Sequence, residues 1–285
     1  MLGVGAYTLW GLVPIYFHAV AHITPLVVVC HRIVWSSLFL ALIVCWRREW
    51  RPIWGVASVR RNVLFLLMAA LLIAINWLVF IYAITTRQVL QASLGYFINP
   101  LLSVALGLIF LGERLRPGQW LALFFAGLGV LNLAVRAGAF PWIALSLATS
   151  FALYGLVRKT VSVHSLHGLL IETLFLLPPA LIWLLLGPSN RLLQDNLGLL
   201  SLSGLVTAVP LLMFGAAVRC LRLSTLGFLQ YVGPSIQFFL ALVFFREPLD
   251  LVRFVSFSLC WLGIVTYLTE SVLTHRAPVV ADRLE

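Results

Sequence analysis

The sequence predicts an all-α membrane protein with ten transmembrane helices arranged as two inverted five-helix repeats. The first observation is composition: 62% of the 285 residues are hydrophobic, 10% are charged, and the mean hydropathy is +1.06. Soluble domains are only about half apolar and about a quarter charged. The second observation is that the apolar residues come in stretches of roughly 20, the helical length that crosses a hydrocarbon core of about 30 Å. The third is an internal repeat.

Short segments that hold nearly all of the charge separate these stretches, so each stretch is interpreted as one transmembrane helix. The first stretch begins at Met1 without a basic leader and continues into further spans, which favours a retained helix over a cleaved signal peptide. The approximate limits are 2–20, 25–46, 62–86, 90–111, 118–135, 140–157, 167–186, 197–218, 225–245 and 251–271.

The placement of charge predicts the orientation. The chain has 19 Lys and Arg residues against 9 Asp and Glu residues. With the N-terminus inside, most of the positive residues, including Arg158 and Lys159, fall in cytoplasmic loops or the tail, as the positive-inside rule requires. We therefore expect both termini in the cytoplasm, a multi-pass protein of the cell inner membrane, the lipid bilayer as its surroundings, and no nucleic-acid partner.

The second half of the chain repeats the first. An offset of 134 residues places Gly233-Pro234 on Asn99-Pro100 and Glu247 on Glu113 without a gap. Each copy holds five predicted helices, and an odd number of crossings makes the second copy enter from the opposite side. The predicted units are residues 1–136 and 139–272, followed by a cytoplasmic tail at 273–285. Inverted repeats of this kind are typical of secondary transporters.

Pro100 and Pro234 lie near the middle of their spans, which at 1.5 Å per residue is about 15 Å deep. A proline in a helix leaves the carbonyl four residues earlier, here on Tyr96 and Gln230, without its helical partner. We therefore expect two helix breaks near the midplane, where protein or a water-filled cavity satisfies the freed carbonyls. The alternative is a packing kink satisfied by a neighbouring helix.

Polar and aromatic residues near these breaks are the candidate substrate-binding residues. Amide groups offer hydrogen bonds, and rings stack on flat or cationic solutes. For Trp10 and Tyr154 the alternative is anchoring at the membrane interface, and only their repeat-related positions, in TLWGLV and ALYGLV at an offset of 144 residues, favour a cavity. The candidates are Trp10, Asn76, Trp77, Tyr96, Asn99, Tyr154, Gln230 and Tyr231.

Two charges, Arg32 and Glu172, lie within predicted spans, where a charge is costly and marks a pathway or a pair. The inverted topology puts them at different depths, which favours two separate sites. Arg32 can also snorkel outward, whereas Glu172 can carry a coupling proton. Glu113 and Glu247 lie about 20 Å past their prolines, outside the core, and we expect each to compensate the dipole of the next helix.

No enzyme chemistry is expected. His164 and His167 form a lone HxxH without a third ligand nearby, so no metal site is predicted. The only lysine is Lys159, preceded by Arg158, so the chain has no GxxxxGK[ST] nucleotide-binding loop. We expect no cofactor.

The chain resembles RarD-type permeases of the EamA branch of the drug/metabolite transporter superfamily. The resemblance rests on LGYFINPLLSVALGLIFLGERL (94–115), HRIVWS (31–36), IETLFLLPPA (171–180) and STLGFLQYVGPSIQFFLALVFFREPL (224–249). It implies an inner-membrane carrier with a central cavity, built mainly from the first four helices of each half, that exports or exchanges small organic solutes.

These observations together predict a secondary active transporter of small organic metabolites or drugs that works by alternating access. Its partner is a small-molecule substrate, and a homodimer is left open. The competing class is a non-transporting membrane scaffold or sensor. Nothing in the side chains encodes a unique substrate, a coupling ion or a direction of transport.

Overall fold

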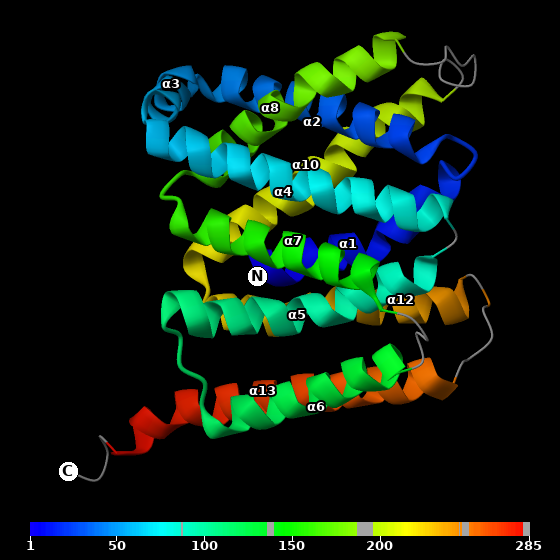
Figure 1. Ribbon diagram of the computed structural model, residues 1–285. Coiled ribbons are helices and arrows are strands. Elements are labelled where there is room, and N and C mark those ends of the chain that lie inside the picture. The colour runs from blue at the N-terminus through cyan, green and yellow to red at the C-terminus, as the bar shows by residue number, and fades with distance from the viewer. Residues whose placement is uncertain (87, 136–139, 187–195, 245, 247–250, 282–285) are drawn as a thin grey trace.

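The computed structural model describes residues 1–86, 88–135, 140–186, 196–244, 246 and 251–281, and every regular element in this part of the chain is a helix. The helices lie side by side, with α3 and α8 at one edge of the bundle and α6 paired with α13 at the opposite edge (Figure 1). They are α1 (Leu2–Ala19), α2 (Pro25–Arg47), α3 (Trp50–Ser58), α4 (Arg60–Thr85), α5 (Val89–Leu111), α6 (Pro117–Val135), α7 (Trp142–Thr160), α8 (Ser165–Leu186), α10 (Leu197–Cys220), α11 (Leu223–Gln230), α12 (Val232–Val243) and α13 (Leu251–Ala281).

Eight segments in the described part of the chain are long and apolar enough to cross a membrane, where the sequence predicted ten. Helices α11 and α12 count as one of these segments, Leu223–Val243. Helices α1 and α7 are not among the eight, because glycines, tyrosines and, in α7, Arg158 and Lys159 lower their mean hydropathy. The all-helical membrane class is therefore confirmed, and the ten-span inverted arrangement stays a prediction.

Three elements differ from the predicted helices. The short helix α3 lies between the second and third predicted spans and was not expected. Helix α13 continues to Ala281 and so includes most of the predicted tail. The ninth predicted span is divided at Tyr231 into α11 and α12.

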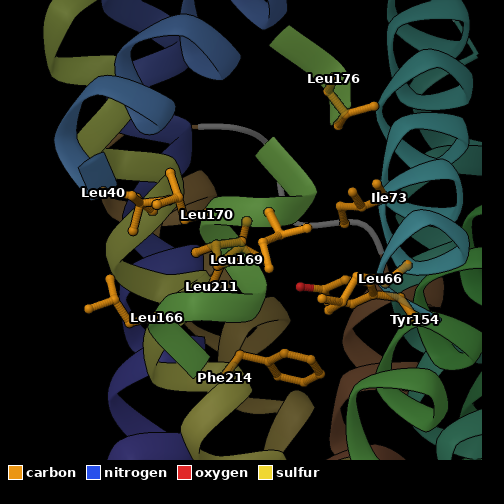
Figure 2. Close-up of a cluster of buried hydrophobic side chains, with 14 of the residues drawn as sticks. Leu40, Leu66, Ile73, Tyr154, Leu166, Leu169, Leu170, Leu176, Leu211 and Phe214 are labelled. Carbon is orange, nitrogen blue, oxygen red and sulfur yellow. The ribbon is translucent and has the colours of Figure 1, made fainter. Parts of the chain in front are cut away.

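The largest hydrophobic core surrounds α8. Figure 2 shows leucines of this helix directed toward side chains of α2, α4, α7 and α10. The labelled residues are Leu40, Leu66, Ile73, Tyr154, Leu166, Leu169, Leu170, Leu176, Leu211 and Phe214. Because α2 and α4 belong to the first half of the chain and α7, α8 and α10 to the second, this core joins the two halves.

Glycines allow close approach where α6 crosses α13. A Cβ added to Gly129 would lie 2.7 Å from the carbonyl oxygen of Ser256, and one added to Gly263 would lie 2.7 Å from that of Ala122. Beside this crossing the amide of Asn132 donates a hydrogen bond to Ser256 Oγ at 2.8 Å. Small residues at such contacts are the usual means by which membrane helices pack tightly.

Candidate functional site

A cavity of about 580 Å³ lies in the middle of the bundle and is lined by α1, α2, α4, α5, α7, α10, α11 and α12. It reaches the last turn of α1 at His18, the last turn of α4 at Ile84 and the first turn of α5 at Ala92. Both halves of the chain therefore contribute to a space large enough for a small organic ligand.

The structure brings most of the predicted site residues to this cavity. The predicted residues that line it are Arg32, Trp10, Asn76, Trp77, Tyr96, Asn99, Gln230 and Pro234. The four that do not line it are Tyr154, Tyr231, Pro100 and Glu172. Sequence reasoning missed several other lining residues, among them Phe17, Phe80, Phe151 and Thr207. The phenylalanines carry no polar signal that separates them from lipid-facing residues.

Arg32 lies in the wall of the cavity between two rings. Its guanidinium carbon is 4.9 Å from the ring centroid of Trp77 and 5.5 Å from that of Phe17. Its Nε donates a hydrogen bond to Thr207 Oγ1 at 2.7 Å. The nearby rings attract the cation electrostatically, and Thr207 fixes the direction of the guanidinium.

The side-chain amides that line the cavity differ in whether their polar atoms have hydrogen-bond partners. The amide nitrogen of Asn76 donates to the Leu147 carbonyl at 2.8 Å and to Ser150 Oγ at 3.0 Å, so it connects α4 to α7. In contrast, Asn99 Oδ1 and Gln230 Oε1 are buried and accept no hydrogen bond from the described residues. Buried polar atoms are normally satisfied, so these two acceptors are available to a ligand.

One end of the cavity lies against a cluster of rings that we call the aromatic floor: Tyr7, Trp10, Phe151, Tyr154 and Phe214. The ring centroids of Trp10 and Phe151 are 5.5 Å apart, and those of Tyr154 and Phe214 are 6.0 Å apart in a stacked arrangement. Trp10 belongs to α1 and Phe151 and Tyr154 belong to α7, so the floor joins the two halves of the chain.

Glu172 contacts this floor through Tyr154. Tyr154 is 1% exposed and donates its hydroxyl to Glu172 Oε2 at 3.1 Å. Glu172 Oε1 is 2.9 Å from Nη1 of Arg158 in a buried ion pair. The expectation that Arg158 lies in a loop is therefore wrong: it lies in the last turn of α7, paired with a carboxylate on α8. Counting it as a loop charge concealed the pair.

The two prolines differ in their effect. Helix α5 continues through Pro100 without interruption, contrary to the predicted break. Its neighbours are close on both sides of the proline: Gly95 approaches the Ala144 carbonyl, and Gly227 approaches the Pro100 carbonyl. Helix α5 is therefore closely packed on both sides of Pro100. Pro234 instead lies in the first turn of α12, where the missing N–H costs little.

The helix division near Pro234 is at Tyr231. This residue is 2% exposed and donates its hydroxyl to the Phe97 carbonyl of α5 at 3.3 Å. It therefore connects the division between α11 and α12 to the helix around Pro100.

Glu113 caps a helix, but not the one that follows it. Its carboxylate accepts the backbone N–H groups of Leu223 at 2.6 Å and Ser224 at 2.9 Å, at the N-terminus of α11. The expectation that it compensates the next helix, α6, is wrong, because α5 packs against α11 and brings its C-terminal end to that helix start. Its repeat counterpart Glu247 lies outside the described residues.

The HxxH residues belong to a polar cluster beside α3. The rings of His164 and His167 are 5.2 Å apart, and His167 Nε2 is 2.8 Å from Glu49 Oε2. Arg47 Nε lies 2.8 Å from the other carboxylate oxygen of Glu49. The hydrogen bond with His167, and then the charge of Arg47, lower the pKa of Glu49. In the described residues no group of three or more His, Cys, Asp or Glu could hold a metal ion.

The fold and cavity define a multi-pass helical membrane protein with a ligand-sized site between its two halves. The profile of the EamA-like transporter family matches residues 1–135. A transporter of Vibrio cholerae, described as uncharacterized, is 44% identical over 284 residues that cover 97% of this chain and 94% of that protein. Protein RarD of Salmonella typhimurium is 41% identical over 97% of this chain and 96% of its own.

The chain belongs to the EamA-like transporter family as a RarD-type permease. A solved crystal structure covers 93% of this chain and 95% of its own with a TM-score of 0.73. Its sequence identity is 17%, so the likeness shows the fold alone.

Proposed function

We propose that this permease is a secondary active transporter that moves small organic solutes across the cell inner membrane by alternating access. The observation that carries the proposal is the asymmetric cavity, which extends from the aromatic floor to the ends of α1 and α4. Residues of both halves form the cavity and the floor, so relative movement of the halves changes which end of the cavity is accessible.

The packing of the helices supports two inverted five-helix repeats within this proposal. Helix α1 packs on α10 and α12, and its repeat counterpart α7 packs on α4 and α5. Three further large contacts join repeat-related helices directly, namely α2 with α8, α5 with α11, and α6 with α13, and the contact of α2 with α10 has a smaller counterpart in that of α4 with α8. An exchange of the two halves maps each of these helix pairs onto itself or onto another of the pairs, as expected for repeats related by a two-fold axis in the membrane plane.

Ser93 and Thr269 offer a matched test. Ser93 is exposed and lines the cavity, whereas Thr269 is exposed on α13 and does not line it. We expect Ser93→Trp to reduce counterflow at least about tenfold, because an indole would fill part of a space of drug-ligand size. Thr269→Trp is expected to retain wild-type counterflow.

The measurement is solute counterflow in proteoliposomes, screened over metabolites and cationic drugs against empty liposomes. If none of the tested solutes shows more counterflow in proteoliposomes than in empty liposomes, the result would support the membrane scaffold or sensor instead. Exchange that persists in full in Ser93→Trp would contradict transport through this cavity.

Glu172 is the coupling group within this proposal, because it is a buried carboxylate whose protonation would release Arg158 and Tyr154. We expect Glu172→Gln to abolish the pH dependence of counterflow. Full flux with an unaltered pH profile in this variant would remove proton coupling from the proposal, while transport itself would stand.

A further inference from the structure

We propose that Arg32 is the anion-binding group of the cavity and that its ligand is a small organic carboxylate with a flat apolar body and one hydrogen-bond donor. The inference rests on the proposed transport function, because it names the substrate class of the same cavity.

The first step is the charge of Arg32. The ion pairs of the described residues join Arg158 with Glu172 and Glu49 with Arg47 and His167, and none of them includes Arg32. Yet Arg32 is a cation within a membrane-spanning helix, where charges normally have a partner. A ligand anion in the cavity would supply the partner that the described chain does not.

The second step is the geometry of the guanidinium. Trp77 and Phe17 lie within 4.9 and 5.5 Å of it, and Thr207 accepts the hydrogen bond of Nε. A guanidinium has five N–H donors, and the hydrogen bonds assigned among the described residues use only Nε. Its terminal nitrogens are therefore available for the two parallel hydrogen bonds that a carboxylate accepts from arginine.

The third step concerns the two unpartnered acceptors. Asn99 is 8% exposed and Gln230 is 6% exposed, and both line the cavity. Gln230 donates its amide nitrogen to Ser103 Oγ at 3.0 Å, which leaves its oxygen for another donor. An N–H or O–H group of the ligand would satisfy these oxygens.

The fourth step is the lining between the charged and polar groups. Phe80, Phe151 and Leu147 contribute apolar surface to the cavity. An inorganic anion would leave this surface in contact with water, whereas an aromatic or aliphatic body would bury it. The described lining contains no carboxylate, so it offers no ion-pair partner to a cationic drug.

The test is equilibrium binding to the purified full chain in detergent, measured by calorimetry. The probe is 4-hydroxyphenylacetate, which combines a carboxylate, a ring and an O–H donor. The comparison ligands are its methyl ester, phenylacetate, tyramine and inorganic phosphate. We expect the ester to bind at least about tenfold more weakly, phenylacetate to bind more weakly than the probe, and tyramine and phosphate not to compete.

Variants of Arg32 test whether this residue is responsible for the preference for the acid over its ester. Arg32→Gln is expected to lower the affinity for the acid at least about tenfold and to leave the affinity for the ester unchanged. Arg32→Lys keeps the positive charge but not the two parallel hydrogen bonds, so it should retain part of the preference for the acid over the ester. Arg61→Gln is the matched control, because Arg61 also lies over a ring, that of Phe65 at 5.6 Å, but does not line the cavity. Arg61→Gln should leave binding of the acid unchanged.

Each outcome separates the inference from the transport proposal. Equal binding of acid and ester by the wild-type chain, or no binding of the acid, overturns the inference even where Arg32→Gln fails to fold. Counterflow of other solutes would then still support a transporter. Arg32-dependent binding of the acid without any counterflow supports the anion site and contradicts transport.

Discussion

Arg158 and Glu172 are 2% and 1% exposed, so each has the other, rather than water, as the counter-charge. Removing one member of such a pair leaves an uncompensated buried charge and costs about 3–5 kcal/mol. We expect Arg158→Gln to lower the thermal stability of the detergent-solubilised protein strongly. The paired change of Arg158→Gln with Glu172→Gln should recover part of the loss, because no unpaired charge remains.

Arg47→Gln is the control for this prediction, because Arg47 is 50% exposed in its ion pair with Glu49. Exposed pairs contribute only about 0–1 kcal/mol. The measurement is the unfolding temperature followed by loss of the monodisperse fraction. Similar losses in Arg158→Gln and Arg47→Gln would contradict the buried pair.

Glu49 gives a prediction with a defined sign. Its pKa is lowered by His167 and Arg47, so its ionised form stabilises the fold above its unfolded-state pKa. That contribution is lost as the pH falls through the lowered pKa. We expect Glu49→Gln to be less stable than wild type at pH 7 and the difference to shrink toward pH 3. Unfolding temperatures of both proteins across this range provide the check; a constant difference would exclude the linkage.

At the level of helices, the cap that Glu113 gives to α11 is directly measurable. Its carboxylate accepts the amides of Leu223 and Ser224, and each lost capping bond costs about 1 kcal/mol. Glu113→Ala should therefore accelerate hydrogen exchange at these two amides about tenfold or more. Glu113→Gln, which keeps one acceptor oxygen, should have a smaller effect.

The amide of Leu226 is the internal control, since it donates to the Arg222 carbonyl at 3.1 Å and does not depend on Glu113. Unchanged exchange at Leu223 and Ser224 in the alanine variant would be evidence against the cap.

The contact of α5 with α11 depends on Gly227. A Cβ at this position would lie 2.8 Å from the Pro100 carbonyl oxygen and 2.9 Å from Val104 Cγ2. Overpacking of this kind costs about 1–3 kcal/mol, so Gly227→Ala should lower the unfolding temperature. Gly127→Ala has open space at its Cβ and should be neutral or stabilising. Equal behaviour of the two variants would contradict the close crossing.

For the whole molecule, the sequence predicted features that depend on local patterns. Apolar length located the helices, and the chemistry of individual side chains identified Asn99, Gln230 and Arg32, which do line the cavity. The sequence did not predict contacts between residues that are far apart in the chain and are brought together only by helix packing. Glu113 and Leu223 are 110 residues apart, and no local signal connects them.

Arg158 is a second example of a partner that the local sequence does not predict. When charges are counted to predict topology, a basic residue near a helix end is taken to lie in a loop. Arg158 is instead neutralised by Glu172, 14 positions later in the chain. Helix α5 likewise continues through Pro100, where it packs closely against α7 and α11, which a proline in the local sequence does not indicate.

The short separation between Arg158 and Glu172 has a consequence for biogenesis. Both charges belong to one helical hairpin, α7 and α8, rather than to helices from opposite halves. The hairpin can therefore neutralise itself as it enters the membrane, before α10 and the later helices have been inserted. In this way two opposite charges can enter the membrane as a neutral pair before the rest of the bundle has assembled.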